Sequence, residues 1–68
     1  MNENASVLFE VWETGTSWIE GKPKIKRIVG SFRSRKEADL CVYDYRERPG
    51  ESGYHYRYDV KVCVIPNP

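Results

Sequence analysis

The feature that most limits how this chain can fold is a strict two-residue alternation near its C-terminus. From residue 54 to residue 64, every even-numbered position carries Tyr or Val. The polar side chains on the intervening positions are His55, Arg57, Asp59 and Lys61. Successive side chains of a β-strand point to opposite faces of the sheet. The pattern therefore predicts a long strand over 54–65 with one apolar face and one solvated face, ended by Pro66.

Two further extended segments precede it. Residues 7–12 are β-branched and aromatic with apolar side chains on both faces, which is typical of a central strand. Residues 24–32 are extended again, and their irregular spacing predicts a bulge or twist between Arg27 and Gly30. The turn-rich stretch 14–23 lies between them. There the first strand either continues through a bulge at Gly15 or gives way to an extended hairpin loop.

A helix is predicted between the second and third strands. Ser34 and Glu37 form a capping box, in which the Ser34 hydroxyl accepts a bond from the Glu37 amide and the Glu37 carboxylate reaches back. Four apolar residues follow at helical spacing, and Pro49 with Gly50 ends the helix. The four residues are Ala38, Cys41, Val42 and Tyr45.

These elements predict an α+β fold in a single domain, residues 1–68, with residues 1–5 as a flexible tail. The order ββαβ gives a three-stranded antiparallel sheet of order 2-1-3 with one helix packed on one face. The third strand lies at an edge. We expect the Tyr/Val face of that strand and the apolar face of the helix to form the core.

Several classes of function lack support in the residues. His55 is the one histidine, with no Ser, Cys or Asp at a spacing that would build a catalytic triad. One His and two separated Cys do not make a zinc site, and no phosphate-binding loop motif occurs. We therefore expect no enzyme, no cofactor and no metal.

The cysteines and the N-terminal residues bear on the compartment. Cys41 and Cys63 are too few for a disulfide framework and are read as free thiols in a reducing compartment. No signal peptide or membrane-spanning run is visible. The predicted location is the cytoplasm, with no membrane contact.

The charge is distributed unevenly, although the net charge is only +1. Between Lys22 and Lys36 there are seven basic residues and no acidic ones. Arg35 and Lys36 stand at the predicted helix start, where basic side chains oppose the helix dipole. That cost favours a use such as contacting phosphates or an acidic protein surface, and the alternative is a solvated basic face.

Three apolar features could also meet a partner. Trp18 and Ile19 sit on a loop of Gly, Ser and Thr, where Trp18 either anchors an interface or caps the small core. The tyrosines on the last strand could stack on bases, but they share a face with valines and are read as core. The last strand, as a free edge, could pair with a second copy.

A resemblance to a known family adds to this picture. Glu37-Ala38 in the predicted helix and the segment 60–66 (Val-Lys-Val-Cys-Val-Ile-Pro) resemble the small early proteins of T7-type bacteriophages that bind and inhibit host bacterial RNA polymerase. That family has a hairpin, one helix and a final strand and performs no catalysis. Of its two basic positions on the last strand, Lys61 fills one and Asp59 stands at the other.

Two shorter likenesses point to other classes. The run 29–32 (Val-Gly-Ser-Phe) before a Ser-capped helix is similar to one half of a peptidoglycan-binding SPOR repeat. The stretch from Lys26-Arg27 to Glu37-Ala38 is similar to the sheet-then-helix of integrase arm-binding domains, which implies DNA binding.

The leading prediction is a small protein-binding module, encoded by a phage or mobile element, that acts as an inhibitor or adaptor by docking on an acidic host protein surface. The alternative is a nucleic-acid-binding domain that uses the basic side Lys22–Lys36. The protein is expected to be a monomer or an edge-strand homodimer. The expected partner-binding residues are Trp18, Ile19, Lys24, Lys26, Arg27, Arg35 and Lys36.

Overall fold

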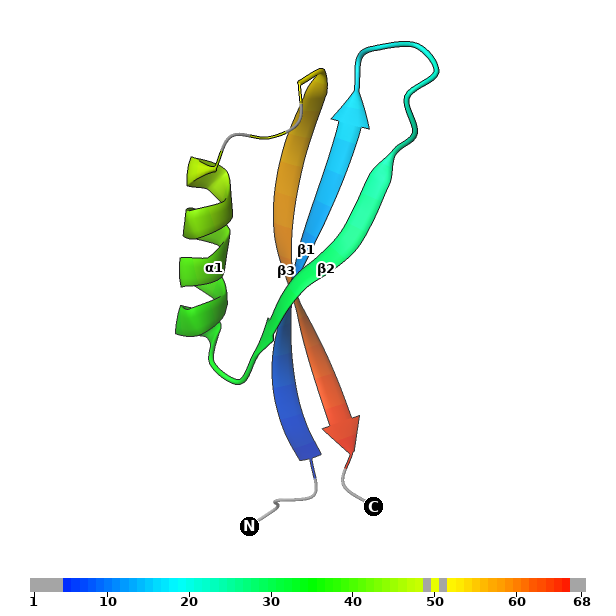
Figure 1. Ribbon diagram of the computed structural model, residues 1–68. Helices are drawn as coiled ribbons and strands as arrows, with labels where there is room; N and C mark the ends of the chain where they lie inside the picture. The colour runs from blue at the N-terminus through cyan, green and yellow to red at the C-terminus, as the bar shows by residue number, and fades with distance from the viewer. Residues whose placement is uncertain (1–4, 49, 51, 67–68) are drawn as a thin grey trace.

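The computed structural model describes residues 5–48, 50 and 52–66 of the 68-residue chain. Three antiparallel strands form one sheet in the order β2-β1-β3, and a helix between β2 and β3 packs against it (Figure 1). The predicted α+β class, strand order and edge position of the last strand are confirmed. The elements are β1 (Ala5–Ser17), β2 (Ile25–Phe32), α1 (Arg35–Glu47) and β3 (Tyr54–Pro66).

The central strand β1 pairs with β3 along its whole length. The register runs without a shift from Ala5 opposite Pro66 to Ser17 opposite Tyr54. The strand therefore continues past Gly15 with no bulge against β3 there, and Ala5 belongs to β1 rather than to the predicted tail. Residues 1–4 of that predicted tail lie outside the described residues.

The pairing of β1 with β2 has one irregularity. Val11 lies opposite Gly30 and Trp12 lies opposite Ile28, which leaves Val29 as an extra residue on β2. The bulge predicted between Arg27 and Gly30 is confirmed. One extra residue shifts the alternation of side chains, so Arg27 and Gly30 both lie on the face that the helix covers.

The helix begins as the sequence predicts. Ser34 is the N-cap, and its Oγ accepts a bond from the Glu37 amide at 3.1 Å. The Ser34 hydroxyl also donates to Glu37 Oε1 at 3.3 Å. The helix ends at Glu47, and Pro49, the predicted stop, lies outside the described residues.

The core is small and lies under the helix. Tyr54, 9% exposed, lies at the end of the sheet where it bonds Pro23, whereas Val11 and Ala38 are fully buried beneath the helix. Around them, the helix residues Cys41, Val42 and Tyr45 are half-buried on the face that the sequence predicted. The odd-numbered residues of β1 share this face with the even-numbered residues of β3.

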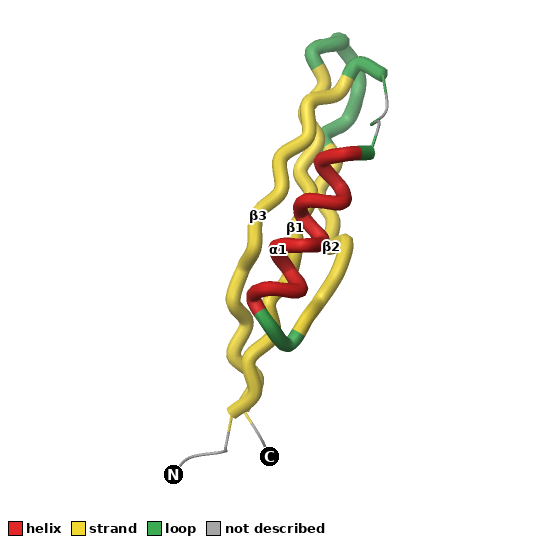
Figure 2. The backbone as a smooth tube through the Cα atoms, turned by 90° about the vertical axis from the view of Figure 1, so that its left-hand side faces the viewer, coloured by secondary structure: helices red, strands yellow, loops and turns green. Residues whose placement is uncertain are grey.

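The core prediction is wrong for the lower half of β3. Val62 is 55% exposed and Val64 is 60% exposed, although they continue the apolar face of Tyr54 and Tyr58. Figure 2 shows why: the helix covers only part of the length of the sheet, and the lower parts of β1 and β3 extend beyond its lower end and continue as a two-stranded ribbon. Val7 on β1 is 41% exposed on the same face of the ribbon.

This ribbon makes the molecule long. Its principal extents are 52 × 23 × 11 Å, and its radius of gyration is 15.0 Å. A compact domain of this length would have a radius of gyration of about 11 Å. Much of the sheet therefore lies far from the buried core.

Because the core is concentrated at Val11, equal truncations should have unequal effects. We expect Val11→Ala to lower the free energy of unfolding by about 2 kcal/mol, through lost burial and a residual cavity. Val64→Ala, measured at low protein concentration, should lower the free energy of unfolding by only a few tenths of that amount, because the Val64 side chain is largely exposed. Urea unfolding followed by circular dichroism measures both, and equal losses would place the core elsewhere.

Candidate functional site

A buried carboxylate lies on the sheet face beneath the helix. Glu13 is 3% exposed, and it sits in register between Arg27 on β2 and Tyr58 on β3. The Tyr58 hydroxyl donates to Glu13 Oε2 at 2.6 Å, and Arg27 Nε donates to Glu13 Oε1 at 2.7 Å. Both oxygens of the acid are therefore satisfied, as a buried charge requires.

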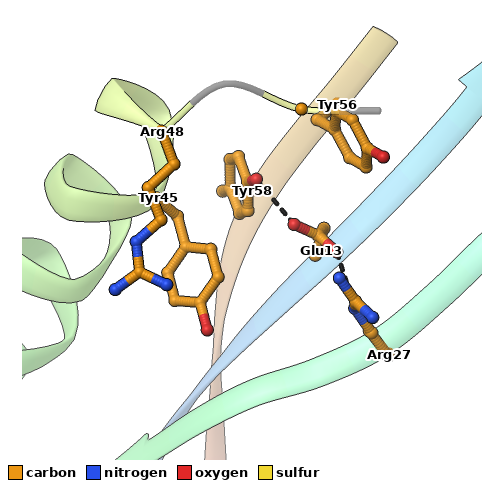
Figure 3. A pocket seen from close by; sticks show the side chains of 7 residues that line it. Glu13, Arg27, Tyr45, Arg48, Tyr56 and Tyr58 are labelled. Atoms are coloured by element: carbon orange, nitrogen blue, oxygen red, sulfur yellow. Dashed lines mark hydrogen bonds and ion pairs between the residues drawn. The ribbon is translucent and has the colours of Figure 1, made fainter. Parts of the chain in front are cut away.

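These three residues form one side of a pocket of 310 Å³ (Figure 3). Tyr45 and Arg48 approach it from the helix end, with the Arg48 guanidinium 4.4 Å from the centre of the Tyr45 ring. The Tyr45 and Tyr58 rings lie 5.7 Å apart. The contacts tie the helix end to the sheet across the pocket.

The electrostatics of the cluster follow from these bonds. Burial and the hydrogen bond to Glu13 raise the pKa of the Tyr58 hydroxyl, so the fold favours its neutral form. The hydrogen bond and charge of Glu13 raise the pKa of Arg27, which stays protonated. Burial also raises the pKa of the Cys41 thiol, which leaves it a poor nucleophile.

The arrangement suits holding strands together better than doing chemistry. Both oxygens of Glu13 accept hydrogen bonds from neighbouring strands, and the Tyr58 hydroxyl donates its proton to one of them. A general base must come within hydrogen-bond reach of the proton that it removes, and Glu13 is 3% exposed. We infer that Glu13, Arg27 and Tyr58 hold the three strands together, and we call this cluster the Glu13 lock.

A second site is the end of the sheet where β1 turns into β2. Trp18 is 63% exposed there, and its ring lies 4.6 Å from that of His55. The turn is ordered: the Ile19 amide donates to Ser17 Oγ at 2.9 Å, and the Lys22 amide donates to the Ile19 carbonyl at 3.3 Å. We call residues 17–24 the tip.

The tip is also fixed to the start of β3. Gly53 has a φ of +90°, and a Cβ at that position would collide with the Ile19 side chain. The Tyr54 hydroxyl donates to the Pro23 carbonyl at 2.7 Å. The backbone that carries Trp18 is therefore held from both sides. Binding would need little further ordering of this turn, so the entropic cost of binding is lower.

A third site is the sheet face opposite the helix, which we call the open face. Trp12 lies at its centre, with Lys61 Nζ 4.9 Å and Lys26 Nζ 5.7 Å from the ring centre. The Trp12 indole N–H donates to Glu10 at 3.1 Å. The polar residues of β3 that the sequence predicted to be solvated are exposed on this face.

The structure divides the residues that the sequence selected for partner binding. Trp18, Ile19 and Lys24 lie together at the tip, with Ile19 44% exposed. Lys26 points to the open face, while Arg27 lies on the helix side with Glu13.

Arg35 and Lys36 begin the helix, at the opposite end of β2 from the tip (Figure 1). Arg35 bonds Asp39 at 3.2 Å. The basic stretch does not form a single patch.

Several residues of these sites, Glu13 and Trp12 among them, were not singled out from the sequence. Glu13 follows Val7, Phe9 and Val11 at two-residue spacing, which could have placed a carboxylate in the core and demanded a partner for it. The grouping of Trp12 with Lys26 and Lys61 depends on strand order and register. No spacing within one segment shows it.

No family model, no curated protein and no solved structure matches this chain. Among the described residues, no helix is long and apolar enough to cross a membrane. Within the same residues, no group of three or more His, Cys, Asp or Glu side chains could hold a metal ion.

The Glu13 lock should give stability a distinct alkaline limit. The pKa of Tyr58 is raised above its ordinary value of 10.0, so its contribution is complete below about pH 10 and is lost as the pH rises further. Tyr58→Phe should lower the free energy of unfolding by about 1–3 kcal/mol at neutral pH, because it leaves a buried oxygen of Glu13 without its hydrogen-bond donor. The difference in unfolding free energy from wild type should shrink above pH 10.

Tyr43→Phe is the matched control, because that ring is 66% exposed on the helix. Its unfolding free energy should follow the wild-type pH curve. If Tyr58→Phe also follows that curve at a constant offset, the hydroxyl does not couple to the fold as described.

Proposed function

We propose that this chain is a non-catalytic protein-binding module that docks on a partner through its tip. The observation that carries the proposal is that Trp18, 63% exposed, stands on an ordered turn instead of filling a core that needs apolar volume. Tryptophan is among the residues most enriched at the centres of interfaces. Ile19 adds an exposed apolar surface beside it.

The charges around the tip favour an acidic partner surface. Lys24 is exposed beside Trp18 and Ile19, and Lys26 follows on the open face. These residues would speed association with an acidic surface at low ionic strength. Arg27 is not counted, because its guanidinium is bonded to Glu13.

The class of partner comes from the resemblance to T7-type phage inhibitors. The strand–strand–helix–strand order is the one expected from that resemblance, and it supports a phage or mobile-element inhibitor or adaptor acting on a bacterial protein. The proposed mechanism is occupation of the partner's surface, without chemistry.

Capture from bacterial lysate tests the tip directly. Tagged wild type should retain a specific protein. Trp18→Ala should retain at least about tenfold less of that protein, as expected when a hot-spot residue is truncated. Leu40→Ala is the matched control, since Leu40 is 59% exposed on the helix. If Trp18→Ala retains the same proteins as wild type, the tip is not the docking site.

Charge reversal tests the steering separately. Lys24→Glu with Lys26→Glu should slow association with the captured partner and weaken its salt dependence. Arg33→Glu with Lys36→Glu changes the net charge equally at the far end of β2. Equal slowing by both pairs would assign the effect to overall charge.

A second candidate, single-stranded nucleic-acid binding, is favoured by one observation on the open face. The Trp12 ring lies between two lysine ammonium groups, and Arg57 and the Trp18–His55 pair share that face. Aromatic rings interleaved with basic residues are the features of a base-stacking platform. Glu10 and Asp59 on the same face oppose a polyanion.

Fluorescence titration with a single-stranded oligonucleotide at low and moderate salt decides this candidate. Quenching that weakens steeply with salt, and that Lys26→Ala with Lys61→Ala removes, would favour it. No quenching at low salt would exclude it.

A further inference from the structure

The two edges of the sheet differ in how well they could accept another strand. The β2 edge carries the bulge at Val29, and Lys26 and Arg27 are its only charged residues. Bulges and charges of one sign are the means by which proteins protect edges from pairing. The β3 edge is regular over all 13 residues, with no register shift against β1.

We propose that β3 pairs antiparallel with the β3 strand of a second copy, about a two-fold axis at Val60. The two three-stranded sheets then form one continuous six-stranded sheet with both helices on the same face. All 13 residues of each β3 strand, from Tyr54 opposite Pro66, are paired in this register.

The charges of β3 select this register. With Val60 opposite itself, Asp59 of each copy lies opposite Lys61 of the other, so two opposite-charge pairs form across the axis. Centring the pair on Asp59 or on Lys61 places like charges opposite each other. Centring on Tyr58 pairs Asp59 with Arg57 but leaves the last residues of both strands unpaired.

The apolar face supports the same arrangement. Val62 of one copy lies opposite Tyr58 of the other, and Val64 lies opposite Tyr56, so the valines left exposed below one helix meet the covered half of the second copy. The free edge at Tyr58–Val60 also lines a groove of 520 Å³ whose wall includes Tyr43, 66% exposed. A second strand at this edge would enter the groove and cover that ring.

The exposed area agrees with a missing partner of this size. The chain exposes 5365 Å². A compact monomer of the same mass would expose about 4,450 Å². The excess is close to the roughly 800 Å² that each partner buries in an interface of ordinary size.

Cysteine cross-linking tests the two-fold axis. In a background with Cys41 and Cys63 changed to Ser, Val60→Cys places two thiols directly opposite each other, at a Cα separation of about 4.5–5.5 Å. A disulfide spans that separation. Val62→Cys is the matched control on the same face: its two copies would be four residues apart along the strands, about 13 Å.

Under mild oxidation we expect Val60→Cys to form covalent dimers in high yield and Val62→Cys, although more exposed, to form few. Uncrosslinked wild type should sediment with a mass about twice the 8.0 kDa of one chain. A wild type that remains monomeric at high concentration, or equal cross-linking by the two variants, would overturn the proposal. The monomeric result is the one expected if the β3 edge binds a different chain instead of a second copy.

Complementary charge variants test the register without new thiols. Asp59→Lys and Lys61→Asp should each be monomeric alone, since like charges then face each other twice. Their equimolar mixture should recover the dimer, because both opposite-charge pairs are restored between unlike chains. Circular dichroism confirms that each variant is folded, and no recovery in a mixture of folded variants would refute this register.

Discussion

The helix α1 and the strands β1 and β3 contain 13 residues each, but the helix covers a shorter length. A helix rises about 1.5 Å per residue and a strand about 3.3 Å, so α1 can shield less than half of β3. The division of the sheet into a covered part and an exposed part follows from this mismatch. The part under the helix holds Val11, Ala38 and the Glu13 lock, and the part beyond it leaves Val62 and Val64 exposed, with Val64 on the two-stranded ribbon. A chain of 68 residues has no second helix among its described residues to cover the remainder.

Within the covered half, a carboxylate takes a place that an apolar side chain could have filled. Burying an ion pair seldom adds net stability over a well-packed apolar group, but removing one partner is costly. Glu13 bonds one residue from each neighbouring strand, Arg27 from β2 and Tyr58 from β3. A shift in the pairing of either strand would leave the buried acid without a partner. The cluster therefore favours this register of the sheet, in addition to the apolar core.

The sequence was sufficient for the elements that local patterns encode. The alternation over residues 54–65, the Ser34 cap and the uneven spacing near Val29 each reflect a short-range rule, and the structure contains the strand, the helix start and the bulge. Prediction failed where coverage depends on the relative lengths of elements. Val62 and Val64 continue the alternation of Tyr58, which packs against the helix, and the position of the helix separates them from it. The basic stretch was divided because Lys26 and Arg27 are consecutive strand residues and therefore point to opposite faces of the sheet.

That division changes which electrostatic effects can matter. Arg27 is bonded to Glu13 and Arg35 to Asp39, so these two cations of the basic stretch are locally compensated. The net charge of +1 gives little long-range field. The charges along β3 act at short range, because Arg57, Asp59 and Lys61 alternate in sign at every second residue. Such a pattern attracts in one alignment and repels in the next, so on this strand charge would select the pairing partner and its register more than the rate of encounter.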